Sequence, residues 1–172
     1  MPKQKIIILD RDGTLIVNID YLNDKNKIIF LPNCIETLKI LSELNYLLFI
    51  VTNQSGIGRG LISKEQYEII TEKIRNEFHL NDVRIIEIKH CPHTPNDKCE
   101  CRKPKVALGS EIIEQYDVDV SQSFVIGDSF SDIEFGMSLN FKTILLNNHE
   151  PNSHTDFIFN NWLDVKEFFK SL

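Results

Sequence analysis

Short apolar runs alternate along the chain with longer segments whose apolar residues recur at helical spacing. The runs predict five strands, at 5–9, 47–51, 84–88, 123–126 and 143–146. Strands that are apolar along their whole length, and that alternate with helices, are typical of a parallel sheet covered on both faces. We therefore expect an α/β fold with a doubly wound, mostly parallel sheet. At 172 residues the chain fits a single domain, 1–172.

Two of the segments between these strands carry clear helix signals. The first helix is expected after Asn33, its predicted N-cap, because apolar residues then recur every third position at Ile35, Leu38, Leu41 and Leu44. In the second segment Ser63 and Gln66 match a capping box, and an apolar stripe follows at Tyr67, Ile70, Ile74 and Phe78. We assign this stripe to the core. Further patterns predict helices at 107–116, 132–139 and 163–170.

The composition, with 42% hydrophobic and 26% charged residues, is that of a globular protein and excludes extensive disorder, collagen-like repeats and coiled coil. The formal net charge of −6 argues against broad attachment to nucleic acid or anionic membranes, so the expected partner is a small molecule. The longest apolar runs, 6–9 and 47–51, are far shorter than the ~20 residues of a membrane span. The first residues lack the pattern of a secretory signal, and no long apolar surface stripe is visible, so we expect a cytoplasmic monomer.

Polar residues follow the predicted strands at the points where these strands end. Asp10 follows the first strand, Thr52 the second, and Asp128 the fourth after one glycine, while a segment rich in Cys and His follows the third. The carboxyl ends of parallel strands lie along one edge of the sheet, where ligands bind. We therefore expect these side chains to converge, since turn chemistry alone rarely produces such a series.

Two carboxylates, Asp10 and Asp12, stand one residue apart directly after the first strand. One would serve as nucleophile or metal ligand and the other as acid and base, whereas the alternative is an ordinary Asp-Gly turn. Asp128, with Asp132 a helical turn later, would complete an all-oxygen site suited to Mg²⁺. The alternative for this second pair is a helix N-terminus that favours acidic residues through its dipole.

The segment 52–60 reads Thr-Asn-Gln-Ser-Gly-Ile-Gly-Arg-Gly. Its hydroxyl, its side-chain amides and the backbone N–H groups of its three alternating glycines can face an anion, and Arg59 adds a charged fork. The Walker and dinucleotide-binding patterns are both absent. The alternative is a flexible surface loop.

Cys91, His93, Cys99 and Cys101 lie within eleven residues and match a four-coordinate zinc site of three thiolates and one imidazole. This set leaves no position for a catalytic water, so the zinc would be structural and would supply folding energy to the loop at about 90–105. The alternative is a group of unrelated buried thiols. Disulfides are not expected in the cytoplasm, and Cys34, outside the cluster, is assigned to the core.

A basic run, Arg102, Lys103 and Lys105, follows the last predicted zinc ligand. A rigid zinc loop would direct basic groups toward the carboxylates, although Lys105 is assigned to solvent. No chemistry is assigned to the remaining histidines, His79, His90, His149 and His154.

Four segments together resemble, in order and spacing, the four motifs of the haloacid dehalogenase superfamily of phosphatases. They are Asp-Arg-Asp-Gly-Thr at 10–14, the segment that begins at Thr52, Lys103, and 127–132 with Asp128 and Asp132. The resemblance covers about residues 8–146. The Cys/His loop that runs into Arg-Lys-Pro is similar to that of the branch containing heptose 1,7-bisphosphate and histidinol-phosphate phosphatases. It implies a Rossmann-like fold without a large cap domain, in which the zinc loop serves in part as a lid.

The resemblance implies a mechanism for the first three motifs. Asp10 would attack phosphorus to form an aspartyl-phosphate, while Asp12 would protonate the leaving alkoxide and later activate water. Thr52 and Lys103 would bind the transferring phosphoryl oxygens, whose charge must be neutralised during in-line transfer.

The resemblance also implies the metal and substrate contacts. Mg²⁺ would be held by Asp10, the backbone carbonyl of Asp12, and Asp128, while Asp132 would support the metal site. The expected substrate contacts are Asn53, Arg59 and Arg102.

The expected substrate within this branch is inferred from short segments and single residues. The segment 52–60, and Tyr21 followed by Phe-Leu-Pro at 30–32, resemble the heptose group, whereas Ile16, Asn18, Ser129 and the sequence after Pro104 depart from it. We expect removal of one phosphate from D-glycero-D-manno-heptose 1,7-bisphosphate, with histidinol phosphate as the alternative. Polynucleotide 3′-phosphatases, which 52–60 also resembles, and a zinc-stabilised module without catalysis are two further alternatives.

Overall fold

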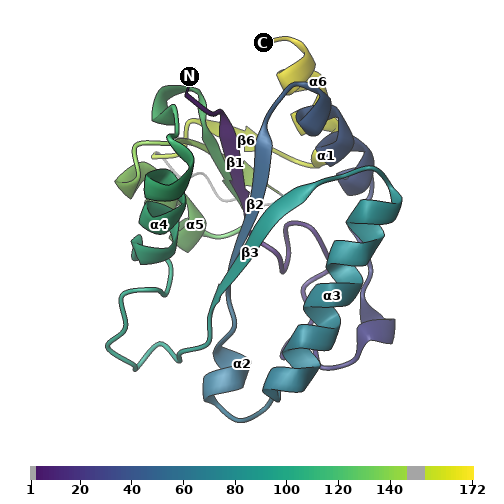
Figure 1. The fold of residues 1–172 in the computed structure, drawn as a ribbon, viewed down its shortest axis with the longest axis vertical. Helices are drawn as coiled ribbons and strands as arrows, with labels where there is room; N and C mark the ends of the chain where they lie inside the picture. Colours follow the sequence, from purple (N-terminus) through teal and green to yellow (C-terminus); the bar gives the residue numbers. More distant parts are fainter. Residues whose placement is uncertain (1–2, 147–153) are drawn as a thin grey trace.

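The computed structural model describes residues 3–146 and 154–172, which form a six-stranded parallel sheet with helices on both faces (Figure 1). The strands are β1 Ile6–Leu9, β2 Leu47–Asn53, β3 Ile85–Cys91, β4 Phe124–Gly127, β5 Lys142–Leu146 and β6 Phe157–Phe159. Their order in the sheet is β3-β2-β1-β4-β5-β6, and each neighbouring pair is parallel. The predicted α/β fold class is confirmed.

Six α-helices and two short 3₁₀ turns connect the strands in the described ranges. The helices are α1 Cys34–Glu43, α2 Ser55–Gly58, α3 Lys64–Leu80, α4 Ala107–Tyr116, α5 Phe130–Ser138 and α6 Trp162–Lys170. The 3₁₀ turns are η1 Lys25–Lys27 and η2 Val120–Gln122. None of the helices in the described ranges combines the length and the apolar character needed to cross a bilayer.

Alternate residues of the central strand β1 pack against opposite helix layers. Ile7 and Leu9 belong to a core cluster that contains buried residues of α1, α3 and α6. Ile6 and Ile8 belong to a second cluster that contains buried residues of α4 and α5. Figure 1 shows α4 and α5 on one side of the sheet and α1 and α3 on the other. Because both faces are covered, β1 is apolar along its whole length.

Several elements differ from the sequence predictions. The strands β2 and β3 run to Asn53 and Cys91, two and three residues beyond the predicted ends. The edge strand β6, which pairs with β5, was not predicted, because a strand of three residues is too short to show a period. The glycine-rich segment after β2 forms the short helix α2, so the alternative of a flexible surface loop is wrong for residues 55–58.

The two predicted helix caps have different outcomes. Ser63 and Gln66 form the predicted capping box, with both reciprocal hydrogen bonds present. Asn33 occupies the N-cap position of α1, but its φ of 61° lies in the left-handed region and its side chain makes no capping bond. The backbone carbonyl of Asn33 instead accepts from the Thr37 hydroxyl at 2.7 Å. The position of this cap was therefore predicted correctly and its interaction was not.

The last helix is tied to the loop that follows β1. The indole Nε1 of Trp162 donates to the backbone oxygen of Thr14 at 2.7 Å. The hydroxyl of Thr37, in α1, donates to the backbone oxygen of Trp162 at 3.0 Å. Both bonds are buried, where an unmade hydrogen bond is costly, so α1 and α6 together fix this loop.

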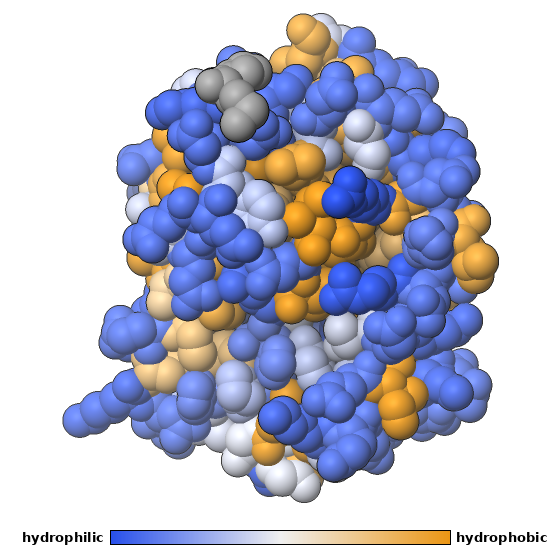
Figure 2. Space-filling model, viewed as in Figure 1, coloured by the Kyte–Doolittle hydropathy of each residue, from blue (hydrophilic) through white to orange (hydrophobic). Residues whose placement is uncertain are grey.

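The strand β3 lies at one edge of the sheet and carries charged side chains. Lys89 pairs with Glu87 at 3.1 Å and with Glu111 of α4 at 2.9 Å. Figure 2 shows that polar side chains cover most of this view of the molecule, while apolar side chains gather near its centre. Charges on an edge strand disfavour pairing with a strand of another molecule.

We predict that α3 contributes to stability through one face only. Ile74 is 1% exposed within the core, whereas Ile69 on the same helix is 52% exposed. Ile74→Ala should lower the free energy of unfolding by about 2–5 kcal/mol, because it leaves a cavity. Ile69→Ala, the matched control, should change it by less than about 0.5 kcal/mol. Urea unfolding of both variants measures this difference, and equal losses would contradict the assigned core face.

Candidate active site

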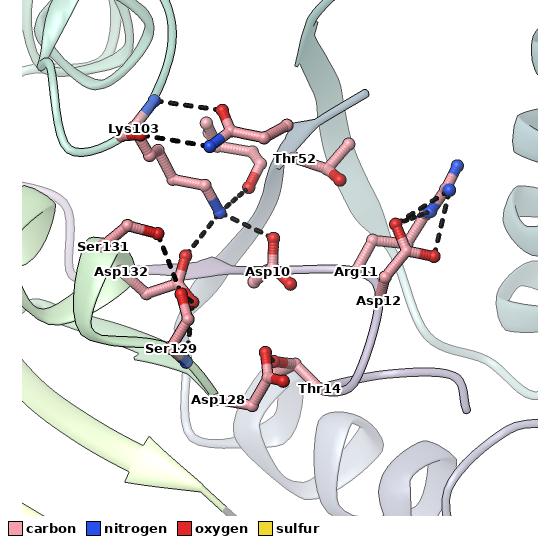
Figure 3. Close-up of polar contacts among 12 residues, drawn as sticks. Asp10, Arg11, Asp12, Thr14, Thr52, Lys103, Asp128, Ser129, Ser131 and Asp132 are labelled. Carbon is pink, nitrogen blue, oxygen red and sulfur yellow. Dashed lines mark hydrogen bonds and ion pairs between the residues drawn. The ribbon is translucent and has the colours of Figure 1, made fainter. Parts of the chain in front are cut away.

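The predicted site residues meet at the carboxyl edge of the sheet. Asp10 directly follows β1, Thr52 lies near the end of β2, and Asp128 directly follows β4. Lys103 reaches the same point from the loop after β3 (Figure 3). Together with Asp12, they line a cavity of about 250 Å³. The convergence expected from the strand order is confirmed.

The ammonium group of Lys103 lies at the centre of this arrangement. Its Nζ donates to Asp10 Oδ1 and to the backbone oxygen of Val51, each at 2.6 Å, and contacts Asp132 Oδ1 at 2.6 Å. The side chain is 3% exposed. Burial alone would lower the pKa of Lys103, but the charges of Asp10 and Asp132 outweigh burial and raise it. The group is therefore a fixed cation at neutral pH.

Three carboxylates, those of Asp10, Asp128 and Asp132, can place one oxygen each within 4.8 Å of one another. Burial raises the pKa of Asp10 to about 8; Lys103 opposes the rise, and Asp132 and Asp12 add to it. Burial, followed by the charge of Asp132, raises the pKa of Asp128 to about 6. A divalent cation would offset this repulsion, and carboxylate oxygens are ligands that Mg²⁺ prefers. The chemistry of these donors therefore fits a divalent cation.

Asp132 serves two structural purposes at once. Its Oδ2 accepts from the backbone N of Ser129 at 3.2 Å and from the Ser129 hydroxyl at 2.6 Å, which caps α5. Its Oδ1 meets Lys103. The alternative that placed Asp132 at a helix N-terminus is correct, because Asp132 caps α5. The same carboxylate also lines the cavity.

The turn after Asp10 fits closely around Asp128. Gly13 has a φ of +84°, and a Cβ at this position would overlap the Asp128 carboxylate, so both the backbone and the space require glycine. The hydroxyl of Thr14 donates to Asp128 Oδ1 at 3.1 Å. The turn therefore orients this carboxylate relative to Asp10.

Asp12 is held by donors that differ from those of Asp10. Arg11 donates from Nε to Oδ2 and from Nη2 to Oδ1 of Asp12, both at 3.0 Å. The amide of Gln54 donates to Asp12 Oδ2 at 2.7 Å and to the Thr52 hydroxyl oxygen at 2.8 Å. Sequence reasoning assigned no role to Arg11, and it gave Gln54 only as one of the side-chain amides of 52–60 that can face an anion.

The three predicted substrate contacts have different positions. Asn53 lines the cavity and holds the Lys103 backbone, accepting from its N at 3.0 Å and donating to its oxygen at 3.1 Å. Arg59 and Arg102 are not among the residues that line the cavity, and Arg102 donates to the backbone oxygen of His93 at 3.3 Å. Their role in substrate binding stays a prediction. The segment 18–22 also lines the cavity; sequence reasoning used its Asn18 and Tyr21 as signals of the substrate group but not as substrate contacts.

The four predicted zinc ligands, Cys91, His93, Cys99 and Cys101, gather at the end of β3. Cys91 Sγ lies 3.1 Å from Cys101 Sγ, 3.8 Å from Cys99 Sγ and 3.6 Å from His93 Nδ1. A tetrahedral zinc ion with Zn–S bonds of ~2.3 Å spaces its ligands by roughly 3.5–3.8 Å. The four side chains lie close together, and the arrangement is able to hold zinc.

Among the described residues, Cys34 and His90 belong to neither of the two candidate metal clusters. Cys34 is buried in α1, as expected. His90 stacks on Tyr67 with ring centroids 4.1 Å apart. His149 lies outside the described residues.

Comparison with known proteins gives a consistent assignment. A family model described as polynucleotide kinase 3 phosphatase matches residues 5–169. The D-glycero-alpha-D-manno-heptose-1,7-bisphosphate 7-phosphatase of Campylobacter jejuni is 35% identical over 170 residues, which cover 98% of this chain and 97% of the relative. The D-glycero-beta-D-manno-heptose-1,7-bisphosphate 7-phosphatase of Haemophilus influenzae is 32% identical over 180 residues and covers 98% of each chain.

A solved structure shows the same architecture. The D,D-heptose 1.7-bisphosphate phosphatase from B. bronchiseptica, complexed with magnesium and phosphate, has a TM-score of 0.88 at 27% identity and covers 98% of this chain and 99% of its own. Similarity of this extent, in sequence and in fold, reaches from the first strand to the last helix. The protein therefore belongs to the haloacid dehalogenase superfamily of phosphatases, in the zinc-loop branch that contains the heptose 1,7-bisphosphate 7-phosphatases.

Proposed function

We propose that this protein is a Mg²⁺-dependent phosphomonoesterase that removes the 7-phosphate from a D-glycero-D-manno-heptose 1,7-bisphosphate. The observation that carries the proposal is the convergence of Asp10, Asp12, Thr52 and Lys103 on one cavity at the carboxyl edge of the sheet. The names of the relatives support the substrate, and the solved relative complexed with magnesium and phosphate supports the cofactor.

In the proposed first half-reaction, a carboxylate oxygen of Asp10 attacks phosphorus and forms an aspartyl-phosphate. The bond from phosphorus to the sugar oxygen breaks, and Asp12 gives its proton to that oxygen. Lys103 and the hydroxyl of Thr52 bind the transferring phosphoryl oxygens and stabilise their charge. The short contact from Lys103 to Asp10 supports this role, because it places the cation beside the attacking carboxylate.

In the proposed second half-reaction, Asp12 takes a proton from water, which attacks the aspartyl-phosphate. The bond between Asp10 and phosphorus breaks, inorganic phosphate leaves, and the Asp10 carboxylate returns. Asp10, Asp128 and the backbone carbonyl of Asp12 would hold Mg²⁺, supported by Asp132. When bound, Mg²⁺ supplies positive charge that neutralises the phosphoryl group.

The size of the cavity favours a small substrate. A volume of about 250 Å³ lies at the low end of ligand cavities. Asn53 lies in its wall, and we propose that Arg59 and Arg102 contact the part of the sugar bisphosphate that does not react. The description of the matched family model makes a 3′-phosphorylated polynucleotide the second candidate substrate.

The first prediction concerns the substrate. With Mg²⁺, kcat/KM for one anomer of heptose 1,7-bisphosphate should exceed the values for histidinol phosphate and for a 3′-phosphorylated oligonucleotide by ~100-fold or more, which is about 2.7 kcal/mol of transition-state binding. Steady-state phosphate release is measured for both anomers of the bisphosphate, for histidinol phosphate and for the oligonucleotide. Asp10→Asn, the control, should lose at least ~1,000-fold in kcat while its melting temperature is retained, since the nucleophile is removed with little change in volume. Preference for the oligonucleotide, or a fully active control variant, would contradict the proposal.

The second prediction concerns the Cys/His cluster, which we propose binds a structural zinc ion. Cys99→Ser should lower both the bound zinc and the melting temperature, because metal binding supplies folding energy to the loop. Metal analysis and thermal unfolding measure the two quantities. Cys34→Ala is the matched control, since Cys34 is buried in α1 and should affect the melting temperature without changing the zinc content. Full zinc content in Cys99→Ser would contradict the assignment.

The third prediction concerns pH. The pKa of Asp10 in the folded protein is about 8 and that of Asp128 is about 6, and both exceed the unfolded value near 3.9. Between about pH 4 and pH 8, the metal-free folded protein therefore binds more protons than the unfolded chain. Its stability should therefore fall as pH rises from about 4 to 8. Mg²⁺ should raise the melting temperature more at pH 8 than at pH 5.5, and Asp128→Asn should reduce this Mg²⁺ effect. Thermal scans with and without Mg²⁺ measure it, and an equal Mg²⁺ effect at both pH values would contradict the prediction.

A further inference from the structure

The side chain of Arg11 is buried beside the carboxylate of Asp12, the second acid of the first motif. It is 3% exposed, and its fork is directed at Asp12 rather than at Asp10 (Figure 3). Its Nε and Nη2 engage both oxygens of the Asp12 carboxylate at 3.0 Å. A planar fork that bonds both oxygens fixes the orientation of a carboxylate, which a single donor does not.

A second donor holds the same carboxylate from the other side. Gln54 is 5% exposed, and its Nε2 lies 2.7 Å from Asp12 Oδ2 and 2.8 Å from Thr52 Oγ1. The backbone N of Gln54 donates to the oxygen of Cys91 at 2.7 Å. Since both the amide and its backbone are bonded, Gln54 sets the distance between Asp12 and Thr52.

The burial of Arg11 is not explained by stability. Among the described residues, its Nη1 has no hydrogen-bond partner. The centroid of the Tyr67 ring lies 5.9 Å from the guanidinium carbon. A buried cation with an unpaired donor is destabilising, and such groups in native structures are often functional. Arg11 therefore needs an explanation beyond packing.

We propose that Arg11, together with Gln54, is a positioning residue that fixes Asp12 for proton transfer. The inference rests on the proposed function. Oδ2 of Asp12 accepts from both Arg11 and Gln54. Among the described residues, Oδ1 accepts only from Arg11 Nη2, so Oδ1 keeps a lone pair for a proton. Asp10 and Asp12 both line the cavity, but Lys103 holds Asp10 whereas Arg11 and Gln54 hold Asp12.

The proton balance follows from this geometry. As the bond from phosphorus to the sugar oxygen breaks, the proton on Asp12 Oδ1 passes to that oxygen. In the second half-reaction, Oδ1 takes one proton from the attacking water. Arg11 also lines the cavity, but both of its hydrogen-bonding nitrogens are engaged by Asp12, so in this scheme it acts through Asp12.

The test compares leaving groups. An alkyl phosphate needs a proton on its leaving oxygen, whereas p-nitrophenyl phosphate releases a stable phenolate without one. Arg11→Gln should lower kcat/KM for the heptose bisphosphate by ~10–100-fold and for p-nitrophenyl phosphate by less than ~3-fold, mainly through kcat. Arg11→Lys, which keeps the charge and loses the fork, should show the same selectivity. Arg75→Gln removes an exposed helix arginine whose partner is Glu72 at 3.8 Å, and should change neither value.

A double-mutant cycle separates positioning from general damage. Asp12→Asn should itself lose far more activity on the alkyl phosphate than on p-nitrophenyl phosphate, and adding Arg11→Gln to it should cause less than a ~2-fold further loss. Equal losses on both substrates, or full additivity in the Asp12→Asn background, would overturn the inference. If Arg11→Gln does not fold, Arg11→Lys gives the same comparison. A wild-type protein that hydrolyses neither compound would instead refute the proposed function.

Discussion

A buried ammonium group determines the geometry of this site. Lys103 Nζ lies within 2.6 Å of a carboxylate that follows β1, a backbone oxygen of β2 and a carboxylate of α5. A charge this deeply buried is tolerated only when it is paired and hydrogen-bonded, so these three elements must stay at fixed distances. The positions of Asp10 and Asp132 relative to the cavity therefore depend on one side chain that comes from a loop.

That loop is itself held from two directions. Cys101 of the metal-binding cluster precedes Lys103 by two residues, and Asn53 bonds both backbone polar groups of Lys103. The segment between β3 and α4 has few apolar residues, so its conformation depends on the contacts of Asn53 and of the Cys/His cluster rather than on a core. The Cys/His cluster, to which we assign a structural role, thus also helps to position the ammonium group of Lys103 in the site.

The sequence predicts the parts of this protein that depend on local pattern. Five apolar strands were predictable, and the parallel arrangement then placed Asp10, Thr52 and Asp128 on one edge. The Cys/His cluster was predictable because its ligands are near each other in sequence. The hydrogen bonds of Gln54, the lining by 18–22 and the short strand β6 were not, because each depends on chain segments that only tertiary packing brings together.

The bond between the Trp162 indole and the Thr14 backbone has a consequence for biosynthesis. Thr14 orients Asp128, and Trp162 lies 148 residues after Thr14 in the chain. A nascent chain emerging from the ribosome presents β1 and its two carboxylates long before α6 exists to support the turn that follows them. Domains generally fold as units during synthesis, and here the segment synthesised first acquires its final hydrogen bonds last. Until then, the turn lacks the buried hydrogen bond that the Trp162 indole donates to it.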